Sequence, residues 1–164
     1  SFTFDLIGYG QHLELLKQHA YNTLHLNPEI VRFIEHPDKQ IIAQYYRTSD
    51  LFIFASKTET QGLVLAESMA GGTPVIALRG PGQEDIIQDG INGFLVDTAD
   101  QMQEKIIALA NNTALHNQLS KKAWLTAQEY TSAKSTQKLI NIYLRSGGTM
   151  ALKRDSNACN AAHK

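Results

Sequence analysis

The sequence predicts an α/β fold in which helices flank a doubly wound, parallel β-sheet. Strand-like and helix-like segments alternate five times at short spacing, and each parallel connection needs a crossover helix on one face of the sheet. Residues 51–55 are continuously apolar, which is typical of a strand buried on both faces. This segment leads into a short polar loop and a helix, and open α/β sheets bind anionic ligands at such places.

Five segments have the composition of strands, and turn residues separate them. Pro74 stands at the first position of its strand, where no ladder hydrogen bond is lost. Asp89-Gly90 and Asn92-Gly93 are tight-turn signals before the last strand. The predicted strands are residues 2–7, 30–34, 51–55, 74–78 and 94–96.

The spacing of apolar residues predicts the helices. Leu13, Leu16, Ala20 and Leu24 share one face of the first helix, and Asn27-Pro28 ends it. The predicted helices are residues 11–26, 39–48, 62–70, 101–110, 113–130 and 133–144, with a helical turn at 84–88.

Length and composition narrow the possible classes of protein. The 164 residues suffice for one domain, residues 1–148, followed by a polar tail, residues 149–164. A net charge of -1 argues against a nucleic-acid-binding protein, and no apolar run is long enough to span a membrane. The single cysteine, Cys159, favours a reducing, cytoplasmic compartment. The chain opens on a strand without Met and shows no signal peptide, so we expect a piece of a longer protein.

The loop and helix after residues 51–55 carry the candidate site. Glu59 and Glu67 lie there with seven residues between them. The backbone N–H groups of Gln61, Gly62 and Leu63 open the helix and can bind an anion, and Gly62 allows a phosphate to approach closely.

The helix itself places Glu67. We expect Leu63, Ala66, Met69 and Ala70 to mark its packed side. Glu67 follows Leu63 by four residues and so lies on the strip of the helix N-terminus. Its carboxylate there suits the two hydroxyls of a vicinal diol, although a salt bridge to a neighbouring Lys or Arg is the simpler alternative. The simpler alternative for Glu59 is a solvated loop residue or a helix N-cap.

The stretch Ser56-Lys57-Thr58-Glu59-Thr60-Gln61-Gly62-Leu63-Val64-Leu65-Ala66-Glu67 resembles the E-x7-E signature of the retaining nucleotide-sugar glycosyltransferases with the GT-B fold. Residues 6–10, 30–34, 46–53 and 82–96 resemble further segments of this family. The resemblance implies that the chain is one Rossmann-like half of a GT-B fold, the C-terminal domain that binds the donor. It also implies hexosyl transfer from a nucleotide-diphosphate sugar to an acceptor hydroxyl on a lipid or a glycan.

The same resemblance implies roles for particular residues. Glu67 would hold the ribose hydroxyls, Glu59 would contact the transferred hexose, and Thr60 with the amides of Gln61, Gly62 and Leu63 would contact the sugar and the diphosphate. The segment Ile34-Glu35-His36 would lie beside the base.

The resemblance also implies what the chain lacks. No metal or other cofactor is expected. The family's Arg and Lys that clamp the diphosphate would lie before residue 1, as would the N-terminal acceptor domain. We therefore expect this fragment alone to be inactive. Contact of the full-length protein with the inner face of a membrane stays open.

Three alternatives remain at this stage. A GT-B-fold sugar-nucleotide epimerase should show more ionisable groups around the donor. A non-catalytic nucleotide-binding module would retain Glu67 but give Glu59 no role. A flavodoxin-like or receiver domain needs an acidic cluster at the first strand end, and Asp5 alone does not supply it.

Overall fold

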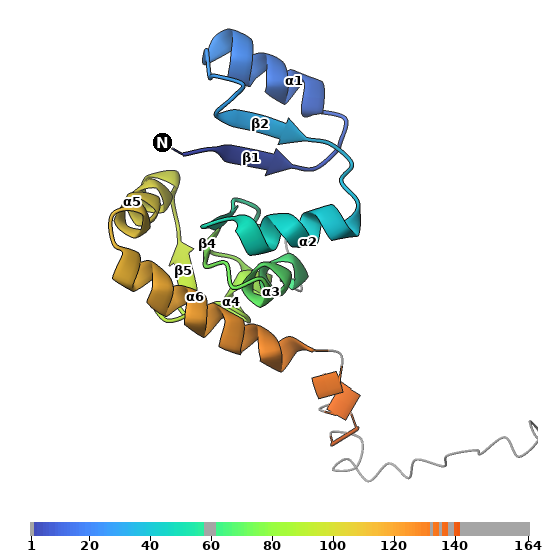
Figure 1. Cartoon of the computed structure of the whole chain (residues 1–164), viewed down its shortest axis with the longest axis vertical. Helices are drawn as coiled ribbons and strands as arrows, with labels where there is room; N and C mark the ends of the chain where they lie inside the picture. Colours follow the sequence, from blue (N-terminus) through green and yellow to red (C-terminus); the bar gives the residue numbers. More distant parts are fainter. Residues whose placement is uncertain (1, 58–61, 132, 135, 138–139, 142–164) are drawn as a thin grey trace, which may run out of the picture.

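The computed structural model (Figure 1) describes residues 2–57, 62–131, 133–134, 136–137 and 140–141. All five predicted strands are present, and every strand pairing in the described part of the chain is parallel. The strands are β1 (Phe4–Ile7), β2 (Val31–Ile34), β3 (Phe52–Phe54), β4 (Val75–Leu78) and β5 (Gly93–Val96). Parallel sheets flanked by helices confirm the predicted α/β class.

The five strands form two sheets. β1 pairs with β2, with Phe4 opposite Val31, and the second sheet has the order β3-β4-β5, with Phe52 opposite Val75 and Val75 opposite Gly93. Figure 1 shows the β1–β2 pair with its helix at the top and the β3–β5 sheet below it. The sequence predicts a single sheet, whereas in the described structure β1 and β3 are not paired with each other.

The helices occupy most of the predicted places. They are α1 (Leu13–Gln18), followed by the π-helical segment η1 (His19–Thr23), then α2 (Lys39–Thr48), α3 (Leu63–Ala70), α4 (Pro81–Glu84), α5 (Ala99–Ala110), α6 (Thr113–Ala127) and the 3₁₀ segment η2 (Gln128–Tyr130). The helical turn predicted at 84–88 begins earlier, because Pro81 fits the first turn of a helix, where no N–H is needed. Most of the predicted helix 133–144 lies outside the described residues. None of the helices in the described ranges is long and apolar enough to cross a membrane.

The core is built on both faces of the β3–β5 sheet. Val75 and Ala77 of β4 pack with Leu65 and Met69 of α3, whereas Ile76 of β4 points to the opposite cluster. That opposite cluster holds Phe94, Val96, Met102, Leu109 and Leu119. The strands buried on both faces are therefore β4 and β5, and the same expectation for residues 51–55 is wrong in this structure. Phe52, Ile53 and Phe54 of β3 are only half-buried.

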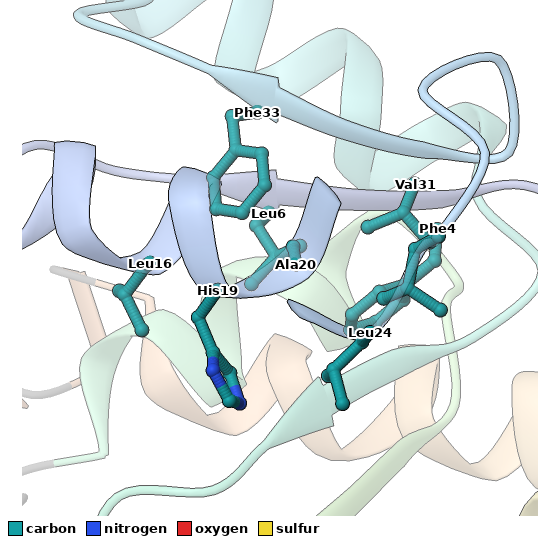
Figure 2. Close-up of a pocket in the computed structure, with 9 residues that line it drawn as sticks. Phe4, Leu6, Leu16, His19, Ala20, Leu24, Val31 and Phe33 are labelled. Atoms are coloured by element: carbon teal, nitrogen blue, oxygen red, sulfur yellow. The ribbon is translucent and has the colours of Figure 1, made fainter. Parts of the chain in front are cut away.

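The first helix departs from its predicted packing. Ala20 is buried, but Leu16 and Leu24 expose 52% and 54% of their surface although both were expected to face the core. They contribute instead to an apolar groove beside β1 (Figure 2). The predicted apolar face of the helix is thus present, but most of it is not packed against other described residues.

Candidate functional site

The connection from β3 to α3 lies at the carboxyl end of a parallel strand, as the sequence predicts. Glu59, Thr60 and Gln61 lie outside the described residues. Gly62 is the N-cap of α3, with a left-handed φ of 64°. A Cβ atom on Gly62 would approach the Gly82 carbonyl oxygen and the Ile86 Cδ1 atom to 2.6 Å. Conformation and packing therefore both require glycine here.

The helix α4 supports the beginning of this loop as well. The side chain of Gln83 is fully buried, and its Nε2 atom donates a hydrogen bond of 2.6 Å to the carbonyl oxygen of Ser56. Gly82 of the same helix packs against Gly62 at the end of the loop. One helix thus fixes both ends of the loop. The sequence analysis missed Gln83, because nothing in its local pattern marks it as buried.

The N-terminus of α3 has the geometry of an anion site. The intrahelical ladder begins with the N–H groups of Leu65 and Ala66, which donate to the Gly62 carbonyl oxygen at 3.0 and 3.1 Å. The amides of Leu63 and Val64 precede that ladder. The first turn of α3 has no acidic residue, so no carboxylate there offsets the positive end of the helix dipole.

The packed side of α3 differs from the prediction. Leu65, Ala66, Ser68 and Met69 are buried, whereas Leu63 exposes 57% of its surface and Ala70 is also exposed. Leu63 and Glu67 nevertheless share one strip, as the four-residue spacing predicts, and Glu67 is exposed on it. The strip faces outward because the helix buries its other side against β4 and α6.

Glu67 has a protein neighbour that the sequence analysis did not find. The side chain of Tyr46, on α2, lies close enough to Glu67 for the charge of that carboxylate to act on the phenol. Burial, and then the negative charge of Glu67, raise the pKa of Tyr46 to about 12. The ring of Tyr46 is fixed edge-on against Phe52, with 5.6 Å between ring centroids. Within the described ranges Glu67 makes no ion pair, so the salt bridge considered above is not formed there.

The backbone around Tyr46 is held against the end of α3. The hydroxyl of Thr73 donates to the Tyr46 carbonyl oxygen and, at 3.2 Å, to that of Ser49. A Cβ atom on Gly71 would collide with the Tyr46 carbonyl, and Gly72 has a φ of 84°. The predicted Gly-Gly helix stop is therefore a close contact at Gly71 followed by a left-handed residue at Gly72. This contact fixes the distance between α2 and α3 and so places Tyr46 beside Glu67.

The segment predicted to lie beside the base begins at the last residue of β2. Ile34 is half-buried, and Glu35 is exposed and paired with Lys17. Hydrogen bonds from Lys17 to Glu35 and Glu14 raise the pKa of the Lys17 ammonium group. His36 stacks on Tyr9 with 4.9 Å between ring centroids. No hydrogen bond or ion pair between described residues connects Ile34 or Glu35 to α3, and their place in one site stays a prediction.

The described ranges contain no group of three or more His, Cys, Asp or Glu side chains that could hold a metal ion. The absence of a cofactor stays a prediction.

Comparison with known proteins identifies the relatives of this chain. Residues 1–125 match the family described as glycosyl transferases group 1. An uncharacterized glycosyltransferase of Haemophilus influenzae is 32% identical over 76% of this chain and 35% of its own length. The alpha-monoglucosyldiacylglycerol synthase of Streptococcus pneumoniae is 39% identical over 62% of this chain and 23% of its own length. The chain thus spans about a quarter to a third of these relatives.

Solved structures show the same fold. The Anabaena protein HepE in complex with UDP-glucose has a TM-score of 0.74 and 24% identity, covering 88% of this chain and 41% of its own. The C-terminal domain of the group 1 glycosyl transferase LpcC from Francisella tularensis has a TM-score of 0.68 and 27% identity, covering 80% of this chain and 70% of its own. Such neighbours are GT-B glycosyltransferases, and they confirm the predicted fold class.

Proposed function

Since the chain belongs to the glycosyl transferases of group 1, we propose that it is the nucleotide-sugar-binding domain of a retaining hexosyltransferase. Nucleotide-sugar glycosyl transfer is the activity of the family as a whole. We add three points to this activity: the retaining stereochemistry, the transfer of a hexose and the role of each site residue.

The position of Glu67 carries the proposal. Its exposed carboxylate lies on the strip that leads to the N-terminus of α3, beside the side chain of Tyr46. A carboxylate has about four acceptor positions, so two ribose hydroxyls can still donate to Glu67. In our proposal a hydrogen bond from the Tyr46 hydroxyl holds the carboxylate in one orientation, which reduces the entropy lost when the ribose binds.

The helix N-terminus supplies the second part of the donor site. The amides of Leu63 and Val64 open α3 without an acidic neighbour in the first turn. Developing negative charge on a leaving diphosphate is stabilised by such preorganised N–H groups. In our proposal Thr60 and Gln61 add contacts to the sugar and the diphosphate. Glu59 orients the hexose near the acceptor hydroxyl, so that transfer proceeds on one face of the sugar.

The relatives suggest which substrates to test first. The HepE structure contains UDP-glucose, and relatives from Acholeplasma laidlawii and Streptococcus pneumoniae are named alpha-monoglucosyldiacylglycerol synthases. We therefore propose a UDP-sugar donor and a lipid hydroxyl as the first acceptor to examine, with a glycan hydroxyl as the second. The acceptor would be bound mainly by a preceding domain, and no metal would be required.

Glutamate-to-glutamine variants test the two proposed roles. In the complete polypeptide, Glu67→Gln should raise the calorimetric Kd for UDP-glucose about tenfold, because a hydrogen bond to a charged group contributes about 1.5 kcal/mol or more. Glu59→Gln should chiefly lower kcat. Glu104→Gln, at an exposed position of α5, is the matched control. Unchanged binding and turnover in both site variants would overturn the assignment.

The product distinguishes the rival activities. A retaining transferase gives a glycosylated acceptor with the anomeric configuration of the donor, which proton NMR can read. An epimerase would alter the sugar without any acceptor, and a non-catalytic module would give no product.

A further inference from the structure

The side chain of Gln83 links two loops at the carboxyl edge of the β3–β5 sheet. Its Nε2 atom donates a hydrogen bond of 2.6 Å to the carbonyl oxygen of Ser56, which lies just after the end of β3. Its Oε1 atom lies beside Gly80, where a Cβ atom would approach it to 2.8 Å. Gly80 lies just after the end of β4, the neighbour of β3 in the sheet. One fully buried amide thus spans the ends of two adjacent strands.

The chemistry of the amide explains this orientation. A carbonyl oxygen only accepts hydrogen bonds, so the NH₂ group of Gln83 must face Ser56. The Oε1 atom of Gln83 is then left without a hydrogen-bond partner among the described residues. The surroundings are also tight, since a Cβ atom on Gly80 would lie 3.2 Å from the Lys57 carbonyl oxygen. Gln83 Oε1 is therefore a buried acceptor without a donor, and such a group lowers stability.

This cost indicates what the amide of Gln83 is for. A methionine side chain has nearly the same length and would bury no unpaired oxygen, but it could not donate to Ser56. Features that lower stability are concentrated at functional sites, where they serve the placement of other groups. The useful property of Gln83 is thus its N–H donor, which holds the backbone where the β3–α3 loop begins.

Gln83 can fix this point because its own helix is held from two directions. Glu84 Oε1 pairs with Arg79 Nη1 at 3.2 Å, at the end of β4. The Tyr130 hydroxyl, which follows α6, donates to the Asp85 carbonyl oxygen at 2.9 Å. The short helix α4 is therefore tied both to the sheet and to the C-terminal helices, and its buried amide can carry this fixed position to Ser56.

We propose that Gln83 is a positioning residue for the transfer step, acting through the backbone at Ser56. The inference rests on the proposed function, in which Glu59 orients the hexose. Glu59 follows Ser56 by three residues, so a shift of the Ser56 backbone passes to Glu59 over a short length of chain. Glu67 and Gly62 have supports of their own, in the packing of α3 and in the contact of Gly62 with α4. Gln83 should therefore govern the rate of transfer and leave nucleotide binding nearly unchanged.

Gln83→Met in the complete polypeptide tests this division. At saturating UDP-glucose, with a diacylglycerol as acceptor, kcat should fall on the order of tenfold to a hundredfold, because small misplacements of a reacting group have effects of this size. The calorimetric Kd for UDP should stay within about twofold of the wild type, since about 0.4 kcal/mol or less is at stake. Gln101→Met is the matched control, because Gln101 Oε1 accepts from the Asp97 N–H at the beginning of α5. An unchanged kcat in Gln83→Met, or an equal loss in the control, overturns the proposal.

Gln83→Glu gives a readout that a purely structural role would not produce. A protonated carboxyl group can donate to the Ser56 carbonyl oxygen, whereas the ionised form cannot. Burial raises the pKa of the introduced carboxyl group, so it stays protonated to a higher pH than an exposed glutamate. The ratio of the variant's kcat to that of the wild type should be highest at low pH and fall as the pH rises through this pKa. A ratio that is constant between about pH 5 and 10 contradicts the donor role, and Gln101→Glu should show such a constant ratio.

Backbone relaxation measured by NMR without any substrate separates this inference from the proposed function. The order parameters of Ser56 and Lys57 should fall from about 0.85, the value of a rigid backbone, towards 0.6 in Gln83→Met, and stay unchanged in Gln101→Met. If the wild type transferred no glucose, the proposed function would fail, and a positioning role of Gln83 at Ser56 would be supported by the expected fall alone. Unchanged order parameters in Gln83→Met overturn that role whatever the activity.

Discussion

Replacing Tyr46 by phenylalanine tests whether the Tyr46 hydroxyl orients the Glu67 carboxylate for donor binding. The substitution removes only the hydroxyl, which in our proposal donates to the Glu67 carboxylate and lies beside its charge. The edge-on contact with Phe52 and the hydrogen bond from Thr73 to the Tyr46 carbonyl stay possible in the variant. Any change in donor binding then reports on the orientation of Glu67 instead of on the fold.

The structure sets the size of the effect. A hydrogen bond to a charged group contributes about 1.5–3 kcal/mol when it is shielded from water. Glu67 is exposed and Tyr46 is half-buried, so solvent competition reduces the value to about 1 kcal/mol. This free energy corresponds to about a fivefold change in an equilibrium constant. We expect Tyr46→Phe to weaken UDP-glucose binding about fivefold in calorimetric titrations.

The matched control is Tyr21→Phe. The Tyr21 hydroxyl donates to the Val31 carbonyl oxygen at 2.9 Å, away from α3, so its loss should leave donor affinity unchanged. If Tyr46→Phe bound the donor as tightly as the wild type, Tyr46 would not orient Glu67 for binding. If both variants lost affinity equally, the effect would be one of general stability.

The raised pKa of Tyr46 adds a dependence on pH. Its value of about 12 lies above the ordinary 10 of tyrosine in an unfolded chain. Folding therefore favours the protonated phenol, and this contribution to stability is fully present below pH 10 and is lost as the pH rises towards 12. The free energy of unfolding should fall over that range in the wild type and fall less in Tyr46→Phe. Equal slopes for both proteins would contradict the interaction.

Three further predictions concern the supporting structure and the fragment. Gly62→Ala should destabilise the protein to urea by about 2–4 kcal/mol, because left-handed strain adds to the clash with Gly82. Gly90→Ala, with a φ of 72° and open space around it, should cost only about 1 kcal/mol, and equal losses would refute the packing role of Gly62. Asp38→Ala should cost about 1 kcal/mol in urea unfolding, because Asp38 caps α2 through the Ile41 N–H at 2.8 Å; no loss would deny that the cap stabilises α2. The 164-residue chain alone should show no turnover in a donor-consumption assay, and measurable transfer would contradict the need for a preceding domain.

Much of the fold could be predicted from local pattern. The alternation of strands and helices, the turn before β5 and the glycine pair after α3 all depend on neighbouring residues, and they are found where the sequence predicts them. The relation between Leu63 and Glu67 was predictable for the same reason, since four residues make about one helical turn.

The remaining features depend on contacts between distant segments. The apolar run in β3 indicates that this strand can be buried on both faces. It does not indicate which strands and helices cover it in the described structure. Tyr46 reaches Glu67 only because Gly71 allows α2 to pack closely on α3, and no local spacing reports that contact. Tyr46 is half-buried on α2, and a buried tyrosine hydroxyl requires a partner; a sign of that burial was the one signal that could have revealed the contact.

A comparison of two nucleotides on two proteins tests the central claim most directly. Calorimetry would measure UDP and its 2′,3′-dideoxyribose analogue binding to the complete wild-type polypeptide and to Glu67→Gln. If Glu67 holds the ribose hydroxyls, the substitution should weaken UDP about tenfold and leave the affinity for the dideoxy analogue almost unchanged. Equal loss for both nucleotides, or no loss for UDP, would show that Glu67 does not bind the ribose.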